Sequence, residues 1–247
     1  MQKILSLMRK CIDQYNMIED GDKIAVGVSG GKDSIVLLKA LHMYSKFSPQ
    51  KFSVVGFTID MFGTNKFREI AKFCESEGIE YHVIPSDIYK IIFEERKEKS
   101  PCSLCSKLRR GMLNTTAIEF GCNKLALGHT ADDIVDTFLL SLFYEGRLSC
   151  FAPVTYLDRT KMTVIRPLIL VDEMMILSES KKLPVVKSEC PADKHTQREF
   201  VRNCVKELRT HIPNVDERIH GAITHPERYN LFDKYVNVDN KKKLGNS

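Results

Sequence analysis

The sequence predicts an α/β fold with a doubly wound parallel sheet and a C-terminal helical extension. Two observations predict this fold. Short β-like apolar runs alternate with helical stretches of ten or more residues, which is the pattern of consecutive βαβ units. Beyond residue 171, helical patterns dominate. The chain has 247 residues, 43% of them hydrophobic and 28% charged, so it is long and apolar enough to bury a full core.

The predicted elements of the first half follow in order. An amphipathic helix is expected over Ile4–Ile18, where apolar residues recur at helical spacing. Four β-like runs come next, at Lys23–Val28, Phe52–Asp60, Glu80–Ile84 and Lys124–Leu127. Helical stretches follow three of these runs, at Ser34–Tyr44, Asn65–Ser76 and Ala131–Tyr144. Parallel strands joined by such helices form a sheet that is covered on both faces.

The pattern changes after Arg147. We expect residues 151–163 to be irregular and Val164–Leu170 to be a short strand-like run. The later helices are expected at Asp172–Lys182, Gln197–His211 and Val215–Ile223, with a β-like Pro184–Lys187 between the first two. The chain is therefore expected to have an N-terminal helix (residues 1–20), an α/β core (21–170), a helical portion (171–235) and a polar tail (236–247).

Composition excludes some classes of protein. No apolar run approaches the roughly 20 residues of a membrane helix, and Met1–Lys10 lacks a signal-peptide core. We therefore expect a cytoplasmic protein without a membrane partner. The net charge is +5, a weak indication of an anionic partner. Basic residues gather around one cysteine pair, at Arg96, Lys97, Lys99, Lys107, Arg109 and Arg110.

The most distinctive local feature is the loop Ser29–Ser34, which has the sequence SGGKDS and lies between a predicted strand and a predicted helix. Gly30 and Gly31 allow the backbone to approach a ligand and to direct its N–H groups into a concavity. The N-terminus of the next helix adds a partial positive charge, and Lys32 adds a full one. This pattern indicates a polyphosphate site. Its glycine spacing differs from that of Walker A and dinucleotide loops. A simple strand-to-helix turn is the alternative.

The chain has eight cysteines, which in a cytosolic protein indicate metal or redox chemistry together with buried thiols. Cys102 and Cys105 form a C-x-x-C motif, a spacing that serves zinc, an iron–sulfur cluster or a dithiol. Cys190 lies in a polar loop and is a better third ligand than the cysteines on apolar helical stripes. These are Cys11, Cys74 and Cys204, which we expect to be core thiols. An ordinary loop thiol is the alternative for Cys190.

Two predicted strands end in acidic segments. Thr130 and Asp133 fit a capping box at the start of a helix, and Asp60 closes the second strand, where it could equally begin a helix. Both positions lie at the carboxyl edge of the predicted sheet, where α/β folds bind ligands. Arg109 and Arg110, one turn past Cys105, can bind phosphate or belong to a solvated face.

Several motifs together resemble the tRNA 2-thiocytidine synthetase branch of the PP-loop ATPases. The strongest are Ser29–Ser34, Pro101–Gly111 and Ala126–Ile134. Shorter matches follow the family's order at Tyr15–Glu19, Gly21-Asp22, Phe143–Gly146, Ile165–Leu168 and Gln197-Arg198. The resemblance extends from about Leu5 to about Ile223. It implies the adenine nucleotide alpha hydrolase-like fold of PP-loop ATPases.

The resemblance also implies an activity, namely ATP- and [4Fe-4S]-dependent thiolation of C2 of a cytidine in the tRNA anticodon loop. ATP, with Mg²⁺, would bind at Ser29, Gly30, Gly31, Lys32, Asp33, Ser34, Asp60, Gly128 and His129. The implied catalytic residues are Asp133, Arg109 and Lys32, and the implied cluster ligands are Cys102, Cys105 and Cys190. Candidate tRNA contacts are Arg110, Arg147, Arg166 and Arg198. The expected partners are tRNA, a sulfur donor (a cysteine desulfurase or free sulfide) and a second copy of the chain.

Other functions remain open at this point. Thr130 stands where many members of the branch have a second His, and Met61–Gly63 is shorter than usual. The chain lacks the extra zinc-binding C-x-x-C pairs of the related tRNA 2-thiouridine synthetases, which disfavours those relatives. A tRNA lysidine synthetase would share the ATP chemistry but would not need the three cysteines. A sulfur-handling enzyme acting on free bases and a non-catalytic nucleotide-binding protein are the remaining alternatives.

Overall fold

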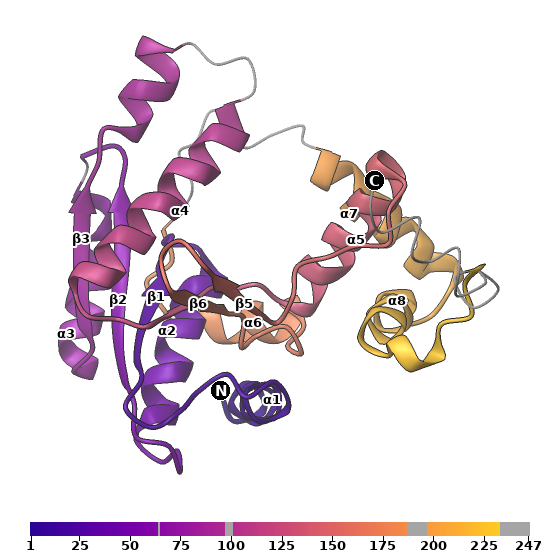
Figure 1. Cartoon of the computed structure of the whole chain (residues 1–247), viewed down its shortest axis with the longest axis horizontal. Coiled ribbons are helices and arrows are strands. Elements are labelled where there is room, and N and C mark those ends of the chain that lie inside the picture. The colour runs from indigo at the N-terminus through magenta and orange to yellow at the C-terminus, as the bar shows by residue number, and fades with distance from the viewer. Residues whose placement is uncertain (64, 97–100, 187–196, 233–247) are drawn as a thin grey trace. The chain divides into compact units, whose positions relative to one another are not determined.

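The computed structural model describes residues 1–63, 65–96, 101–186 and 197–232 (Figure 1). The chain divides into two compact units, residues 1–202 and 203–247. The four parts predicted from the sequence are a different division of the chain and stay a prediction. The helices are α1 (Gln2–Gln14), α2 (Lys32–Ser45), α3 (Arg68–Glu77), α4 (Pro101–Glu119), α5 (Ala131–Glu145), α6 (Glu173–Ser180), α7 (Gln197–His211) and α8 (Val215–Thr224). Short helical segments are η1 (Asn65–Phe67), η2 (Lys90–Glu95) and η3 (Pro226–Arg228).

The first unit contains a six-stranded sheet with the strand order β3-β2-β1-β4-β6-β5. Its strands are β1 (Lys23–Gly27), β2 (Ser53–Asp60), β3 (Glu80–Pro85), β4 (Lys124–Ala126), β5 (Val154–Leu157) and β6 (Met162–Ile165). All neighbouring pairs are parallel except β5 and β6. In the central register, Ile24 of β1 lies opposite Val54 of β2 and Lys124 of β4. The predicted parallel sheet is confirmed except at its edge, where β5 is antiparallel.

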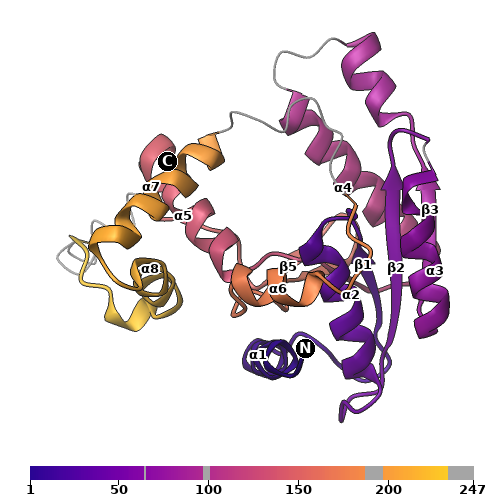
Figure 2. The same cartoon turned by 180° about the vertical axis from the view of Figure 1, so that it is seen from behind.

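The two faces of the sheet are covered by different helices (Figures 1 and 2). Phe57 of β2 belongs to a buried cluster that includes Leu113 of α4. At the preceding residue of β2, Gly56, an added Cβ would lie 3.1 Å from the Leu38 side chain of α2. Because successive strand residues face opposite sides, α2 and α4 cover opposite faces, as a doubly wound sheet requires.

The antiparallel edge corrects one expectation. Residues 151–163 were expected to be irregular, but they contain β5 and most of a β5–β6 hairpin. The two strands have only four residues each, and Tyr156 is exposed, so the apolar signal is weak. The expected strand at Val164–Leu170 is also corrected, because β6 ends at Ile165 and the following residues form turns. Residues 184–186 form no strand.

Two further elements lie between β3 and β4, where the sequence analysis predicted none. One is η2, a π-helical segment with Ile92 buried. The other is α4, which places the C-x-x-C motif in its first turn. Gly111 and the β-branched pair Thr115-Thr116 weaken the helical signal of α4.

No helix in the described part of the chain is long and apolar enough to cross a membrane.

The second unit contains the later part of α7, all of α8 and η3. Arg209 and Asp216 join α7 to α8, with Arg209 Nε 3.2 Å from Asp216 Oδ1. Cys204 lies in this unit and is half-buried, whereas Cys11 and Cys74 are buried in the first unit. The expectation of a core thiol is therefore confirmed for Cys11 and Cys74 and wrong for Cys204.

Candidate active site

The loop between β1 and α2 is held in a defined shape by its own residues. Gly30 has a φ of +88°, in the left-handed region that favours glycine. The Ser34 hydroxyl accepts a hydrogen bond from the Ser29 N–H at 3.1 Å and donates one to the Gly31 carbonyl at 2.9 Å. The backbone N–H groups at the start of α2 therefore surround a concavity at the helix N-terminus, where anions bind well.

A cavity of about 370 Å³ opens at this loop. It lies at the carboxyl ends of β1 and β4, between which the strand order reverses, the usual ligand site of a doubly wound sheet. Polar and charged side chains on its wall are Ser29, Asp33, Ser34, Ser106, Arg109, Arg110, His129 and Asp133. Apolar side chains complete the wall at Val28, Phe57, Ile59, Leu113 and Leu127. The cavity thus has one apolar part and one charged part.

Gly128 allows the loop after β4 to approach the start of α2. A Cβ added there would lie 3.0 Å from the carbonyl carbon of Asp33 and 3.1 Å from the Ser34 nitrogen. Contacts this short with backbone atoms cannot be relieved by a side-chain rotation. Gly128 is therefore needed for the two loops to meet, which is why it lines the same cavity as Asp33 and Ser34.

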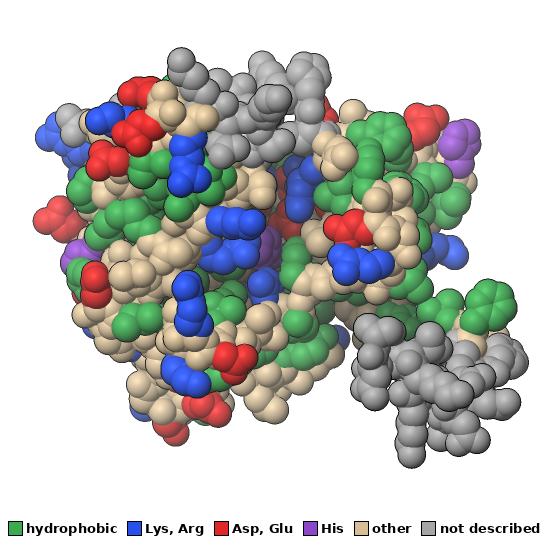
Figure 3. Space-filling model, turned by 45° about the horizontal axis from the view of Figure 1, so that its top comes forward, with side chains coloured by type: hydrophobic (Ala, Val, Ile, Leu, Met, Phe, Trp, Pro, Cys, Tyr) green, Lys and Arg blue, Asp and Glu red, His purple; other side chains and the backbone are tan. Residues whose placement is uncertain are grey.

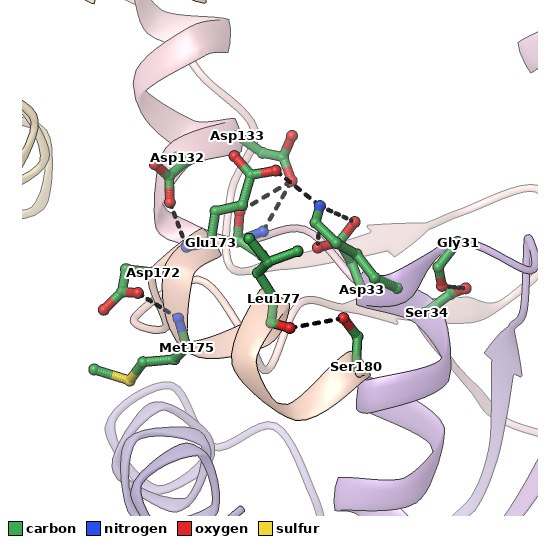
Figure 4. A network of polar contacts seen from close by, with 12 residues as sticks. Gly31, Asp33, Ser34, Asp132, Asp133, Asp172, Glu173, Met175, Leu177 and Ser180 are labelled. Atoms are coloured by element: carbon green, nitrogen blue, oxygen red, sulfur yellow. Dashed lines mark hydrogen bonds and ion pairs between the residues drawn. The ribbon is translucent and has the colours of Figure 1, made fainter. Parts of the chain in front are cut away.

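Lys32 is shared by two carboxylates. Its Nζ lies 3.1 Å from Asp33 Oδ1 and 2.8 Å from Glu173 Oε1, at the first residue of α6. Burial by itself would lower the pKa of Lys32. The hydrogen bonds and negative charges of Asp33 and Glu173 outweigh it, so the pKa is raised and the lysine stays protonated. Figure 4 shows Asp33, Asp133 and Glu173 converging from α2, α5 and α6.

Asp133 has both the predicted capping role and a set of charged partners. Its Oδ2 accepts a hydrogen bond from the Thr130 N–H at 3.0 Å, in a complete capping box at the start of α5. Its Oδ1 lies 3.3 Å from Arg198 Nη1 and 3.4 Å from Arg202 Nη2. Arg202 Nε also donates to Asp136 Oδ2 at 2.6 Å. The first turns of α7 are thus bound to the first turns of α5.

His129 stacks on Phe151, with ring centroids 4.6 Å apart. Burial lowers the pKa of His129 to about 4, so its imidazole is neutral at neutral pH. Arg166 lies over the same Phe151 ring at 5.1 Å and donates to the Ala152 carbonyl at 2.7 Å. His129 Nδ1 and Arg166 Nε are buried without a hydrogen-bond partner among the described residues.

The C-x-x-C motif lies beside the cavity. Cys105, in the first turn of α4, is half-buried, and its Sγ lies 3.8 Å from Met61 Sδ. Ser106 and Arg109, on the following turn, line the cavity. The side chain of Cys102 and the whole of Cys190 lie outside the described residues. Among the residues described, no group of three or more His, Cys, Asp or Glu side chains is arranged to hold a metal ion.

The described residues on both sides of 187–196 contact the site. The Val186 N–H donates to the Gly30 carbonyl at 2.9 Å, in the loop itself. On the other side, Arg198 contacts Asp133. Val186 and Arg198, the described residues that flank this range, thus both have partners in the site.

Comparison with known proteins identifies the family. Residues 2–208 match the family model described as the PP-loop domain. A tRNA-cytidine(32) 2-sulfurtransferase from Geobacter metallireducens is 40% identical over 240 residues, covering 94% of this chain and 93% of the relative. The chain belongs to the tRNA-cytidine 2-sulfurtransferase family of PP-loop proteins. The family resemblance predicted from the motifs is thereby confirmed.

Other members of this PP-loop family, and a solved structure, are also similar. The tRNA-cytidine(32) 2-sulfurtransferase of Ectopseudomonas mendocina is 38% identical over 250 residues, covering 96% of this chain and 91% of the relative. The U34-tRNA thiolase NcsA from Methanococcus maripaludis, solved with its [4Fe-4S] cluster, has a TM-score of 0.75 and 27% identity. That match covers 93% of this chain and 80% of NcsA.

The PP-loop site gathers most, but not all, of the residues predicted for it. The cavity wall lacks Asp60 and also Gly30, Gly31 and Lys32, although these last three belong to the loop that borders it. Asp60 Oδ1 accepts hydrogen bonds from the Phe62 and Gly63 N–H groups. Arg147 is exposed and pairs with Glu145, also away from the cavity wall. Glu173 and Asp136 were not predicted. Asp136 could have been recognised, because an aspartate is unusual within the apolar stretch of α5. Glu173 gave no such signal, because acidic residues are common in the first turn of a helix.

Proposed function

We propose that this chain is an ATP-dependent tRNA sulfurtransferase that adenylates and then thiolates C2 of a cytidine in the tRNA anticodon loop. The observation that carries this proposal is the identity of 40% over 94% of the chain with a tRNA-cytidine(32) 2-sulfurtransferase. The cavity supports it, since an anion-binding loop, two arginines and a carboxylate line one space.

The first step is adenylation. The cytosine O2 attacks the α-phosphorus of ATP, and the bond to the bridging oxygen breaks, so pyrophosphate leaves. The N–H groups of Ser29–Ser34 and the Lys32 ammonium hold the departing pyrophosphate. Arg109 neutralises charge that develops on the α-phosphate. Mg²⁺ would accompany the triphosphate, and Asp33 and Asp133 on the cavity wall offer the carboxylate oxygens that this ion takes.

In the second step, a sulfur nucleophile attacks C2 and AMP leaves with the former cytosine oxygen. A [4Fe-4S] cluster held by Cys102, Cys105 and Cys190 would supply this sulfur bound to iron. The chain's donors fit such a cluster in two respects. Cys105 lies beside the cavity, and the described residues on each side of 187–196 contact the ATP loop and Asp133.

Asp133 and His129 have distinct parts in this proposal. The two arginines of α7 hold Asp133 in one orientation, with its carboxylate toward the cavity, where it orients the cytosine or accepts a proton. His129 is neutral, because burial lowers its pKa to about 4. A neutral imidazole contributes hydrogen bonds on the ATP side without adding a positive charge.

The test of the proposed function is a reconstituted reaction. The purified, cluster-loaded protein is incubated with unmodified tRNA, ATP, Mg²⁺ and sulfide, and the nucleosides are analysed by mass spectrometry. We expect ATP-dependent formation of 2-thiocytidine. Thiolated uridine or lysidine would support the corresponding PP-loop alternatives. ATP binding without pyrophosphate release would instead support a nucleotide-binding protein.

We further propose a basic surface for tRNA. Figure 3 shows Lys and Arg side chains gathered along a hollow on one face of the molecule. Arg110 is exposed and lines the cavity, and Arg147 is 70% exposed. Arg166 and Arg198 are bound within the chain to the Ala152 carbonyl and Asp133, so they contribute only through their remaining donors.

This surface predicts a steep salt dependence. Each phosphate neutralised by a Lys or Arg releases counterions, so the logarithm of the tRNA affinity should fall linearly with the logarithm of salt concentration. Filter-binding titrations with the Arg110→Gln and Arg147→Gln variants should show weaker binding and a shallower slope, by about one ion per arginine. A flat salt dependence of the unaltered protein would contradict an RNA substrate.

The remaining properties are proposals as well. We propose a cytoplasmic protein that acts as a homodimer and receives sulfur from a cysteine desulfurase or from free sulfide. Supplying each donor in turn to the reconstituted reaction, and measuring the molar mass in solution, tests the donor and the oligomeric state.

A further inference from the structure

Glu173 is held firmly at the edge of the ATP loop. Its N–H donates to Asp132 Oδ2 at 2.7 Å, which joins the start of α6 to the start of α5. Asp172 caps α6 by accepting a hydrogen bond from the Met175 N–H at 2.7 Å. The Ala131 N–H, in turn, donates to the Val171 carbonyl at 3.0 Å. These bonds, most of them visible in Figure 4, fix the backbone from which the Glu173 carboxylate reaches the loop.

The Glu173 carboxylate binds the lysine that the proposed function assigns to pyrophosphate. Glu173 Oε1 lies 2.8 Å from Lys32 Nζ, and the two side chains are 36% and 25% exposed. Asp33 binds the same ammonium at 3.1 Å. The Lys32 ammonium is thus already neutralised within the protein. A pyrophosphate that binds Lys32 must displace the carboxylate of Asp33 or Glu173, or else be repelled by its negative charge at close range.

We propose that Glu173 is a positioning residue that competes with pyrophosphate for Lys32. It holds the ammonium at the loop when the site lacks polyphosphate, releases it when ATP binds, and takes it back as pyrophosphate leaves. No covalent step is involved, since one ion pair replaces another. The inference rests on the proposed function, because it requires that ATP bind at Ser29–Ser34. As a result of this competition, the protein binds pyrophosphate more weakly and releases it faster than it would without the Glu173 carboxylate.

The raised pKa of Lys32 agrees with this exchange. Burial alone would lower the pKa, but the hydrogen bond and charge of Glu173, together with Asp33, raise it. The lysine therefore carries its positive charge throughout. Glu173 acts on where the ammonium lies and on what it binds, rather than on its protonation.

The chain offers a closely matched control. Lys39, also on α2, pairs with Glu77 at 3.3 Å, and these side chains are 24% and 34% exposed. Glu173→Gln and Glu77→Gln therefore remove the same charge from Lys–Glu pairs of similar burial on the same helix. Neither glutamate is on the cavity wall itself. The two variants differ chiefly in whether the lysine belongs to the ATP loop.

The experiment titrates inorganic pyrophosphate, with Mg²⁺, into the purified full chain by calorimetry. Glu173→Gln should bind pyrophosphate about 3- to 10-fold more tightly, because the Lys32 ammonium no longer has to leave the Glu173 carboxylate before it binds pyrophosphate. Glu77→Gln should have the same affinity for pyrophosphate as the unaltered protein. Glu173→Asp, which keeps the charge, should have nearly that affinity. In turnover, Glu173→Gln should lower both the KM for ATP and kcat, with a burst of pyrophosphate in the first turnover.

A second measurement tests whether the effect passes through Lys32. In a Lys32→Gln background the gain from Glu173→Gln should largely disappear, as a double-mutant cycle shows for residues that act together. Equal or weaker pyrophosphate binding by Glu173→Gln would overturn the inference. Weakening that occurs only with Mg²⁺ would overturn it too, since it would make Glu173 a metal ligand. If the unaltered protein bound neither ATP nor pyrophosphate, the proposed function would fail first.

Discussion

Replacing Lys32 or Asp33 with alanine should abolish adenylation while leaving the fold intact. Lys32 supplies the full positive charge at the loop, and Asp33 lies on the cavity wall and pairs with it. Removing one preorganised group that stabilises the transition state costs about 100-fold or more in rate. Both side chains are partly exposed, so the loss of stability should stay within about 0.5 kcal/mol. Pyrophosphate release from ATP, measured with tRNA present, is the readout.

The control for this prediction is Lys39→Ala. Lys39 lies on the same helix and pairs with Glu77 at 3.3 Å, away from the cavity wall. It should release pyrophosphate at the unaltered rate and melt at nearly the same temperature as Lys32→Ala. If Lys32→Ala or Asp33→Ala released pyrophosphate at the wild-type rate, the loop would have no part in adenylation.

Replacing Cys190 with alanine should eliminate thiolation and degrade the iron–sulfur cluster, while ATP binding survives. In the proposed site Cys102 and Cys105, three residues apart in α4, would bind one side of a four-iron cluster, and two thiolates alone would leave two irons without a protein ligand. Anaerobic reconstitution followed by iron analysis and nucleoside mass spectrometry measures the loss. ATP binding should persist because the loop and the cavity wall are built from other residues.

Cys204→Ala is the matched control for Cys190→Ala. Cys204 is half-buried in α7, so its loss should cost only packing, about 1 kcal/mol or less. Cys11 and Cys74 are poorer candidates for the third ligand, because burial raises their pKa to about 12 and about 11. Full iron content in Cys190→Ala together with loss of iron in Cys204→Ala would reverse the assignment.

Local signals were sufficient for much of the fold. The α7 helix was predicted at Gln197–His211, as the structure has it, because its apolar stripe is strong. The start of α5 was predicted from its capping box. The β5–β6 hairpin and α4 were missed for opposite reasons. The hairpin strands are short and β5 is half-exposed, whereas Gly111 with nearby threonines weakens the helical pattern of α4.

The candidate site was predicted where residues adjacent in sequence carry the chemistry, as in Ser29–Ser34. Glu173 could not be found this way, because its partner Lys32 comes from a distant part of the chain. An acidic residue after a capping aspartate also has an ordinary explanation in the helix dipole. For Asp60, the position at the strand end is the only local signal and its role stays a prediction; the Phe62 and Gly63 N–H groups bind its carboxylate.

Hydrogen bonds that close the ATP loop have a consequence for the order in which the protein is made. The Gly30 carbonyl accepts a hydrogen bond from the Val186 N–H, and the Lys32 ammonium lies 2.8 Å from Glu173 Oε1. A chain emerging from the ribosome therefore presents the glycine loop early, but the residues that brace it are synthesised more than a hundred residues later. We therefore expect nucleotide binding to arise late in synthesis, once Glu173 and Val186 have joined the loop.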